Sequence, residues 1–475
     1  MVGNDPIAVG DRQDVESVTV TLAEYIANTA YSDLPDSAVF AAKRAVLDQV
    51  GLILLGSTLP WSTPAVTVLS SFGGAPESAV LGTLKRAPAV HAAMINSGFG
   101  HACEMDDSGY TGGCHPGSLT VPPALALAER DGLSGKDVLL AIVVGYEVLS
   151  RMGRVMTEAL LARGFHHQSV IGPFGVAAAA GRLLRFDRET MVNALAIAGS
   201  HSGGVAEYDQ QGGEVKRYHS SIAVQGGMMA ALLAQAGLTG PYSILEGTKG
   251  VPLLFAGVSD VHDIVAGLDD VSGLAVERTT FKPYPATGTL HTSIYALSEL
   301  MKEHPFGPDD VESIDVMLSP LAKSHGGSIT EPQDVIGAQF SLGFSLALVL
   351  LFRRCVLADY MNADLWNDPD VKKIGSKVHI HTSEEFTGPI LTGARLRVSL
   401  TDGRVLDREE LYRKGSPVNP LSSDEMTEKF RGSAGAVLDD EHMDRVISLI
   451  EHLDELDDVG ELVAALVPDD QSVMA

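Results

Sequence analysis

Apolar residues recur at helical spacing through most of the first 275 residues of the chain. After Leu34-Pro35-Asp36 they lie three or four positions apart until Gly56. A second strongly apolar run follows Ser134 and Asp137, whose spacing is that of a capping box at a helix start. Few alternating β-branched residues interrupt this pattern. Residues 20–275 therefore predict a large all-helical domain.

The pattern changes after Val276. Three segments alternate apolar and polar residues in the manner of half-buried strands, at residues 311–318, 377–382 and 394–401. Asp402-Gly403 directly after the third segment is a strong hairpin signal. Helical spacing between the strands predicts helices at residues 288–304 and 339–359. This part of the chain is expected to form a smaller α+β domain.

Helical spacing returns after Pro420, where Ser422 and Glu425 form a second possible capping box. The last helices are expected to pack back on the first domain, which makes the strand-containing region an insert. The predicted fold is therefore mainly α with an α+β insert. Residues 1–278 and 417–475 form the all-helical domain, and residues 279–416 form the α+β domain.

The composition and net charge of the chain limit the kinds of molecule that it is expected to bind. The chain has 475 residues, of which 45% are hydrophobic, enough for two or three cores. Its formal net charge of −27 disfavours binding to nucleic acid or to an anionic membrane surface. No apolar run approaches the ~18 residues of a membrane-spanning helix. A small anionic substrate remains compatible with this charge wherever local cations reverse the field.

Cysteine usage and the N-terminus bear on the compartment. Three cysteines, at scattered positions, do not make a disulfide framework. The N-terminus lacks a charged segment followed by an apolar one, which a secretory signal would show. These features predict a reduced, cytoplasmic protein.

The most unusual stretch is residues 101–117, HACEMDDSGYTGGCHPG, which a hydrophobic core would not need. If the preceding helix runs unbroken over residues 91–107, His101, Glu104 and Ser108 share one face while Asp106 points elsewhere. The glycine-rich turn then returns His115 towards that face. This stretch predicts the polar wall of a pocket.

Three other segments carry candidate chemistry. His166 and His167 lie in a loop before a helix, where a histidine is more often a cap or a surface residue. Lys216 and Arg217 open a long helix, which suits a carboxylate or phosphate, although an ordinary solvated first turn has the same composition. Lys282, in the stiff segment Phe281-Lys282-Pro283-Tyr284-Pro285, lies where the helical region ends; a plain linker is the alternative.

Sequence motifs for cofactors are absent. HExxH, CxxC, GxGxxG and GxxxxGK[ST] do not occur, so zinc, iron–sulfur clusters and nucleotides have no support from motifs. The remaining interpretation is acid/base chemistry without metal or organic cofactor. Histidines would move protons, and lysines would hold carboxylates and a developing enolate.

The order of several segments resembles the MmgE/PrpD family, which includes 2-methylcitrate dehydratase, cis-aconitate decarboxylase and iminodisuccinate epimerase. The segments that carry the resemblance are LDQVGLILLGS, HACEMDDSGYTGGCHPGS, RGFHHQSVIGPFG, GGEVKRYHSS, FKPYPATGTLH, AQFSLGFSLALVLL and LTDGRVLDREELYRKGSPVNP. The resemblance implies a helical domain made from both chain ends, an inserted α+β lid, a homodimer, and an active site between domain and lid that needs no cofactor.

The same resemblance implies roles for individual residues. The catalytic residues would be His115, His166, Lys216 and Lys282. The substrate-binding residues would be His101, Glu104, Ser108, Arg217 and Tyr284. Three departures from the family pattern stand out: Thr287 where the decarboxylase has a second lid histidine, Phe344 where many members have tyrosine, and His167 where proline is usual.

The resemblance favours a lyase that abstracts a proton next to a carboxylate of a di- or tricarboxylic acid. A 2-methylcitrate dehydratase-like activity is the preferred interpretation, because Thr287 departs from the decarboxylase. A cis-aconitate decarboxylase-like or an iminodisuccinate epimerase-like enzyme is the alternative, since all three reactions pass through a carboxylate-stabilised carbanion. A non-catalytic carboxylate-binding protein or a structural dimer is the non-enzymatic alternative.

Overall fold

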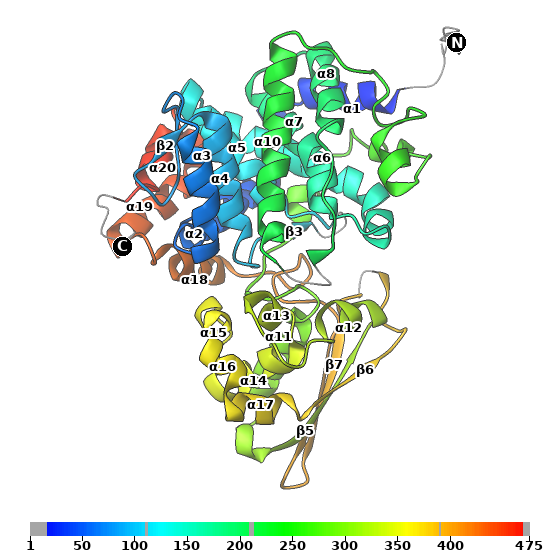
Figure 1. Cartoon of the computed structure of the whole chain (residues 1–475), viewed down its shortest axis with the longest axis vertical. Coiled ribbons are helices and arrows are strands. Elements are labelled where there is room, and N and C mark those ends of the chain that lie inside the picture. The colour runs from blue at the N-terminus through cyan, green and yellow to red at the C-terminus, as the bar shows by residue number, and fades with distance from the viewer. Residues whose placement is uncertain (1–16, 110–112, 209–212, 389–390, 469–475) are drawn as a thin grey trace.

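A computed structural model describes residues 17–109, 113–208, 213–388 and 391–468 of the chain. Two bodies are visible in Figure 1, a larger helical one and a smaller one that contains a sheet. The helices of the larger body are α1 (Val18–Asn28), α2 (Asp36–Ser57), α3 (Thr63–Ser71), α4 (Ala89–His101), α5 (Pro116–Asp131), α6 (Gly135–Ala162), α7 (His167–Leu183), α8 (Arg188–Gly199), α10 (Val215–Gln235), α18 (Ser423–Ala434), α19 (Asp440–Glu451) and α20 (Gly460–Ala465).

The helical body forms around one hydrophobic core that draws on both ends of the chain. Residues between Val18 and Phe281 share it with residues between Leu421 and Leu466. The predicted capping boxes are present at the starts of α6 and α18. Helix α18 packs on α2, where Gly51 lets Phe430 approach closely. The last helices therefore return to the first part of the chain, as the hydrophobic pattern predicts.

Two short strand pairs depart from the expectation of helices alone in this region. β1 (Ser78–Ala79) pairs with β2 (Arg86–Ala87), and β3 (Ser108–Gly109) pairs with β4 (Thr279–Thr280). The second pair joins the polar stretch to the segment that leads out of the helical body. None of the helices in the described residues is both long and apolar enough to cross a membrane.

The smaller body, here called the lid, has its own core between Ala286 and Leu400. Its elements are α11 (His291–Glu303), β5 (Val311–Leu318), α12 (Pro320–Gly326), α13 (Val335–Gln339), α14 (Leu342–Phe352), α15 (Leu357–Met361), α16 (Ala363–Asn367), α17 (Pro369–Gly375), β6 (Val378–Thr382), β7 (Ala394–Leu400) and β8 (Val405–Glu410). The strands lie in the order β6-β5-β7-β8, with only β5 and β6 parallel.

The alternation seen in the sequence sets the two faces of this sheet. Ile314, Val316 and Leu318 of β5 are fully buried, whereas intervening Asp315 lies beside Arg397 of β7 on the open face. The helix expected over residues 339–359 is instead broken into pieces. Arg353 adopts a left-handed conformation, with φ of 58°, and ends α14 there.

The chain passes between the two bodies twice, and the two passages lie side by side. The amide of Phe281 donates to the carbonyl of Gly415 at 3.0 Å. Gly415 has φ of 90°, and a Cβ there would lie 1.8 Å from the carbonyl oxygen of Phe281. Only glycine allows this close approach, so the two connections form one narrow neck.

Candidate active site

The predicted continuous helix over residues 91–107 is wrong, and its early end creates the site. Helix α4 stops at His101, and Glu104 adopts a left-handed conformation with φ of 57°. A non-glycine residue held there is strained, by about 1 kcal/mol or more. The turn sends Glu104 to one side and brings Asp106 back against His101. Asp106, expected to point elsewhere, is thus part of the site.

Distant parts of the chain hold this turn, which we call the catalytic loop (residues 102–107). The carbonyl of Cys103 accepts a hydrogen bond from Gln339 of the lid at 3.2 Å, and its thiol lies 3.8 Å from the carbonyl of Leu52 in α2. The carbonyl of Met105 accepts from the ammonium of Lys429 in α18 at 2.9 Å. Three elements far apart in sequence therefore fix the loop.

Glu104 joins the two lysines that the sequence proposed as separate anion ligands. Its carboxylate pairs with Lys216 at the start of α10 and lies 3.0 Å from the ammonium of Lys282. All three side chains are buried, Lys282 with only 2% exposed. Burial favours a raised pKa for Glu104, but the ammonium groups of Lys216 and Lys282 outweigh it and hold that pKa well below its usual range. The site thus carries two cations around one carboxylate.

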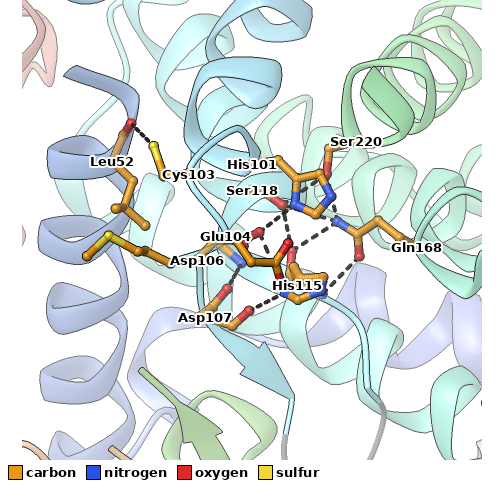
Figure 2. A network of polar contacts seen from close by, with 12 residues as sticks. Leu52, His101, Cys103, Glu104, Asp106, Asp107, His115, Ser118, Gln168 and Ser220 are labelled. Atoms are coloured by element: carbon orange, nitrogen blue, oxygen red, sulfur yellow. Dashed lines mark hydrogen bonds and ion pairs between the residues drawn. The ribbon is translucent and has the colours of Figure 1, made fainter. Parts of the chain in front are cut away.

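Asp106 forms the second half of the cluster (Figure 2). One of its oxygens accepts from Nδ1 of His101 at 2.6 Å and lies 3.6 Å from Nδ1 of His115; the other lies 3.8 Å from Lys282. Burial would raise the pKa of Asp106, but His115 and His101 lower it more. Nε2 of His101 is buried without a hydrogen-bond partner. Such an unpaired atom is rare in a folded interior and is available to a ligand.

His115 is held with one ring nitrogen free for chemistry. Its Nδ1 lies 2.7 Å from the carbonyl oxygen of Asp107, which can only accept, so Nδ1 carries the proton and Nε2 of the neutral ring carries a lone pair. Burial lowers the pKa of His115 to about 3, which keeps the ring neutral near pH 7. Its side chain is still 12% exposed, so the ring can meet a ligand. These features suit a general base.

Two supports fix the position of His115. Its backbone amide donates to Oε1 of Gln168 in α7 at 2.9 Å, and the Gln168 amide group donates to Ser220 of α10 at 2.7 Å (Figure 2). Asp107 accepts from Tyr146 and from the amide of Gly117, at 2.7 and 2.9 Å. Burial raises the pKa of Asp107 to about 7. Four helices or helix ends therefore converge on this histidine.

His166 lies at the start of α7 and pairs with a histidine that the sequence analysis did not single out. The Nδ1 atoms of His166 and His219 are 2.8 Å apart, and both residues are 3% exposed. The His166 ring also stacks on that of His101, with centroids 6.3 Å apart. His219 follows Lys216 by three positions on α10. That i, i+3 spacing places both on one helix face and is the signal that could have found it.

Two family models match the sequence. The MmgE/PrpD N-terminal domain matches residues 20–262, and the MmgE/PrpD C-terminal domain matches residues 284–455. The chain belongs to the MmgE/PrpD family.

Several similar proteins are named for cis-aconitate decarboxylase activity. The cis-aconitate decarboxylase of Aspergillus terreus is 30% identical, over 96% of this chain and 97% of its own length. A cis-aconitate decarboxylase-like protein of Aspergillus oryzae is 29% identical over 97% and 99%, and human cis-aconitate decarboxylase is 27% identical over 95% of each chain. This chain is therefore an enzyme of the MmgE/PrpD type. These relatives agree better with the decarboxylase alternative than with the preferred dehydratase.

Two of the binding residues expected from the MmgE/PrpD resemblance are directed away from the cluster. The guanidinium of Arg217 stacks on Trp61, 3.9 Å from the ring centroid, and pairs with Glu214. Tyr284 packs edge-on against His291, with ring centroids 5.3 Å apart, and lines a separate cavity of about 520 Å³. Lys216 and Lys282, one and two positions away, do face the cluster.

The other positions noted for the MmgE/PrpD pattern lie at varying distances from the chemistry. Ser108 is buried in β3 and pairs with Thr280 through the backbone. His167 lies beside His166 and its Nε2 is 2.7 Å from the carbonyl of Gly113. Thr287 is buried at the start of the lid. Phe344 packs in the lid core, edge-on to Tyr360, so its ring contributes to the lid interior.

Three residues of the cluster could in principle hold a metal ion. His101, Asp106 and His115 each offer one ligand atom, and these atoms lie within 4.8 Å of one another. However, Asp106 already accepts from His101 and lies 3.8 Å from the Lys282 ammonium. A divalent cation would meet strong repulsion from that ammonium and from nearby Lys216. The charge arrangement fits an anion better than a metal.

Proposed function

We propose that this MmgE/PrpD enzyme removes CO₂ from a small tricarboxylic acid of the cis-aconitate type. The observation that carries the proposal is the paired placement of Lys216 and Lys282 around Glu104, next to His115 with its free Nε2. Two buried ammonium groups can hold two carboxylates of one substrate. The names of the relatives, at 27–30% identity over nearly the whole chain, support the choice of reaction.

The lysines would bind substrate by exchanging carboxylates. Glu104 pairs with both ammonium groups, so they are already desolvated and oriented. A substrate carboxylate takes over part of this pairing. Its remaining carboxylates would meet the unpartnered Nε2 of His101 and the faces of His115 and His166.

His115 would move the proton. In decarboxylation, the bond to the departing carboxylate breaks, CO₂ leaves, and the electron pair shifts through the double bond to the carbon that takes a proton. His115 must then be protonated when substrate is bound, although burial lowers its pKa to about 3. The negative charge of the bound substrate raises the proton affinity of a nearby histidine, which meets this need.

A dehydratase is the second candidate, for two reasons. Neutral His115 is ready without further change to abstract a proton next to a carboxylate, which is the first step in loss of water. Thr287 also stands where, by the family resemblance, the decarboxylase has a second lid histidine. Both candidates use the same lysines and histidines.

Proton NMR of the purified full chain with separate acids tests the proposal. Cis-aconitate, 2-methylcitrate, citrate and iminodisuccinate are incubated one to a tube. A decarboxylated product from cis-aconitate supports the proposal, dehydration of 2-methylcitrate supports the second candidate, and inversion of iminodisuccinate would replace both with an epimerase. Thermal stabilisation without product would indicate a non-catalytic carboxylate-binding protein.

His115→Ala tests the catalytic role of His115. Loss of the proton-transfer group should lower kcat by about 10²–10⁴-fold. The fold should remain, since the hydrogen bonds that position this segment use the backbone of His115 and not its ring. Circular dichroism and thermal unfolding check this, and exposed His452→Ala should match the parent in both measurements. Full activity in the His115 variant would overturn its role.

A further inference from the structure

His166 and His219 form a histidine pair whose direct contact restricts where their protons can lie. Two imidazole Nδ1 atoms 2.8 Å apart cannot both carry a proton, which would clash, or both present a lone pair. One proton must lie between them. The ring centroids are 5.0 Å apart, and both rings are buried, so water does not compete for this contact.

The position of this proton decides what His166 presents on its other side. If Nδ1 of His166 carries the shared proton, the neutral ring has a lone pair at Nε2 and can accept a proton. If His219 carries it, Nε2 of His166 carries a proton and can donate. The second histidine therefore determines whether the first acts as a base or as an acid.

One lysine and several aromatic rings surround the pair. His101 of α4 and His167 of α7 lie beside His166, Lys216 is on the same helix as His219, and the ring of Tyr208 packs against both histidines. Burial, with the nearby histidines and Lys216, lowers the pKa of His166 well below its usual range and that of His219 to about 4. Both rings are neutral near pH 7, so the tautomer of each ring determines which of its nitrogens can donate a proton and which can accept one.

We propose that His219 is a positioning residue that sets the tautomer of His166 through this shared proton. The inference rests on the proposed function, in which His166 faces the bound substrate, and it adds that His166 exchanges a proton there. When Nε2 of His166 accepts a proton, the proton on its Nδ1 moves to the Nδ1 lone pair of His219. His166 ends as the opposite neutral tautomer, and the positive charge ends on His219. The reverse transfer restores the pair.

Kinetics of three variants test the role during turnover. His219→Phe keeps a ring but removes the nitrogen, and should lower kcat by about 10–100-fold with little change in KM, as loss of an orienting partner does. His219→Asn places an amide near the position of Nδ1 and should recover most of that loss. Tyr218→Phe, one position away on α10, should behave as the parent. Unchanged kcat in His219→Phe, or a raised KM alone, overturns the proposal.

A second measurement needs no substrate. In full-length protein labelled with ¹⁵N-histidine, the shared proton should give a strongly downfield ¹H signal coupled to the two Nδ1 atoms. It should disappear in both His166→Phe and His219→Phe, with circular dichroism confirming that each variant folds. Absence of the signal in the parent overturns the inference. Presence of the signal with no turnover of any acid would reject the proposed function and leave the histidine pair supported.

Discussion

At the scale of single residues, the site is a set of charges that balance one another before substrate arrives. Glu104 pairs with Lys216 and Lys282, and Asp106 supplies a second negative charge between His101 and Lys282. Buried ammonium groups are costly without partners. On the proposed function, substrate binding would replace one carboxylate by another, and the cost of burying the lysines is met by folding. The affinity for substrate would then depend on how readily Glu104 gives up part of its pairing with the two lysines.

Asp106 should contribute to catalysis as much as the site residues that the sequence predicted. Asp106→Asn preserves size but removes the charge that faces His101 and Lys282, so both lose their orienting partner. We expect kcat/KM to fall by about 10–100-fold, as for other orienting carboxylates. Initial rates with the acid identified by NMR give this value.

Asp315→Asn is the matched control for that change. Asp315 lies on the open face of the lid sheet and pairs with exposed His381, so this variant should keep parent kinetics. If Asp106→Asn kept the kcat/KM of the control, Asp106 would have no part in the reaction.

At the scale of elements, α18 reaches the chemistry through Lys429. Its ammonium lies 2.5 Å from Asp48 of α2 and donates to the carbonyl of Met105 in the catalytic loop. The C-terminal helices thus do more than complete the core. They hold the loop that carries Glu104 and Asp106.

Lys429→Met should weaken both stability and catalysis. It leaves Asp48 buried without its cation, and breaking a buried pair typically costs about 3–5 kcal/mol. We expect the lower part of this range, because burial raises the pKa of Asp48 even beside Lys429 and allows it to take up a proton. Urea unfolding and kcat measure the two effects.

The double variant Asp48→Asn with Lys429→Met separates these effects. Removing the stranded carboxylate should restore much of the lost stability, while the Met105 carbonyl still lacks its donor and kcat stays low. Recovery of kcat together with stability would show that the contact to the loop has no catalytic role.

Elements also show how far the sequence carries the prediction. Periodicity and capping residues predict most helices, and the alternation over residues 311–318 matches β5. The bend at Glu104 was not predictable in this way, because its supports at Leu52, Gln339 and Lys429 are distant in sequence. Local spacing favoured a straight helix, and tertiary contacts overrode it.

Two neighbouring residues on α10 also show the limit of prediction from local sequence. Lys216 and Arg217 read alike as candidate anion ligands, but successive residues point about 100° apart around an α-helix. Which of the two faces the site depends on the packing of α10. That packing sends Arg217 to Trp61 and Lys216 to Glu104.

At the scale of the whole molecule, buried neutral histidines should make stability depend on pH. Burial lowers the pKa of His115 and His291 to about 3 and of His219 to about 4, and that of His166 is also low. In the unfolded chain these groups titrate near ~6.5, so below that pH the unfolded state binds more protons and the free energy of unfolding falls. Asp107, with its pKa raised to about 7, acts in the opposite direction between pH 3.8 and 7.

Asp48, whose pKa burial also raises, acts in the same direction as Asp107. Four histidines outweigh these two acids, so stability should decrease from pH 7 to pH 5. Each histidine contributes a slope of up to about 1.4 kcal/mol per pH unit. Urea unfolding in matched ionic strength at pH 7, 6 and 5 measures the change. A protein more stable at pH 5 than at pH 7 would contradict the neutral state of these histidines.

The separate cores predict that the helical body can fold without the lid. Replacing residues 286–412 with a short Gly-Ser linker preserves the neck at Phe281 and Gly415, and the larger core contains no residue from the excised segment. We expect helical circular dichroism and a cooperative thermal transition at reduced temperature, because Leu357 of the lid also packs on Leu52 and Cys103. A non-cooperative transition would show that the two bodies fold only together.

The narrow neck at Phe281 and Gly415 has one further consequence. Any swing of the lid would pivot there, and displacement grows with distance from a pivot. Lys282 follows Phe281 directly and would barely move, whereas Gln339 and Phe340, which meet Cys103 and Lys216 from the lid, would move with the lid. The mouth of the site would then open and shut while its anchoring charge stayed in place. The entry of a metabolite and its electrostatic binding would then depend on different parts of the protein.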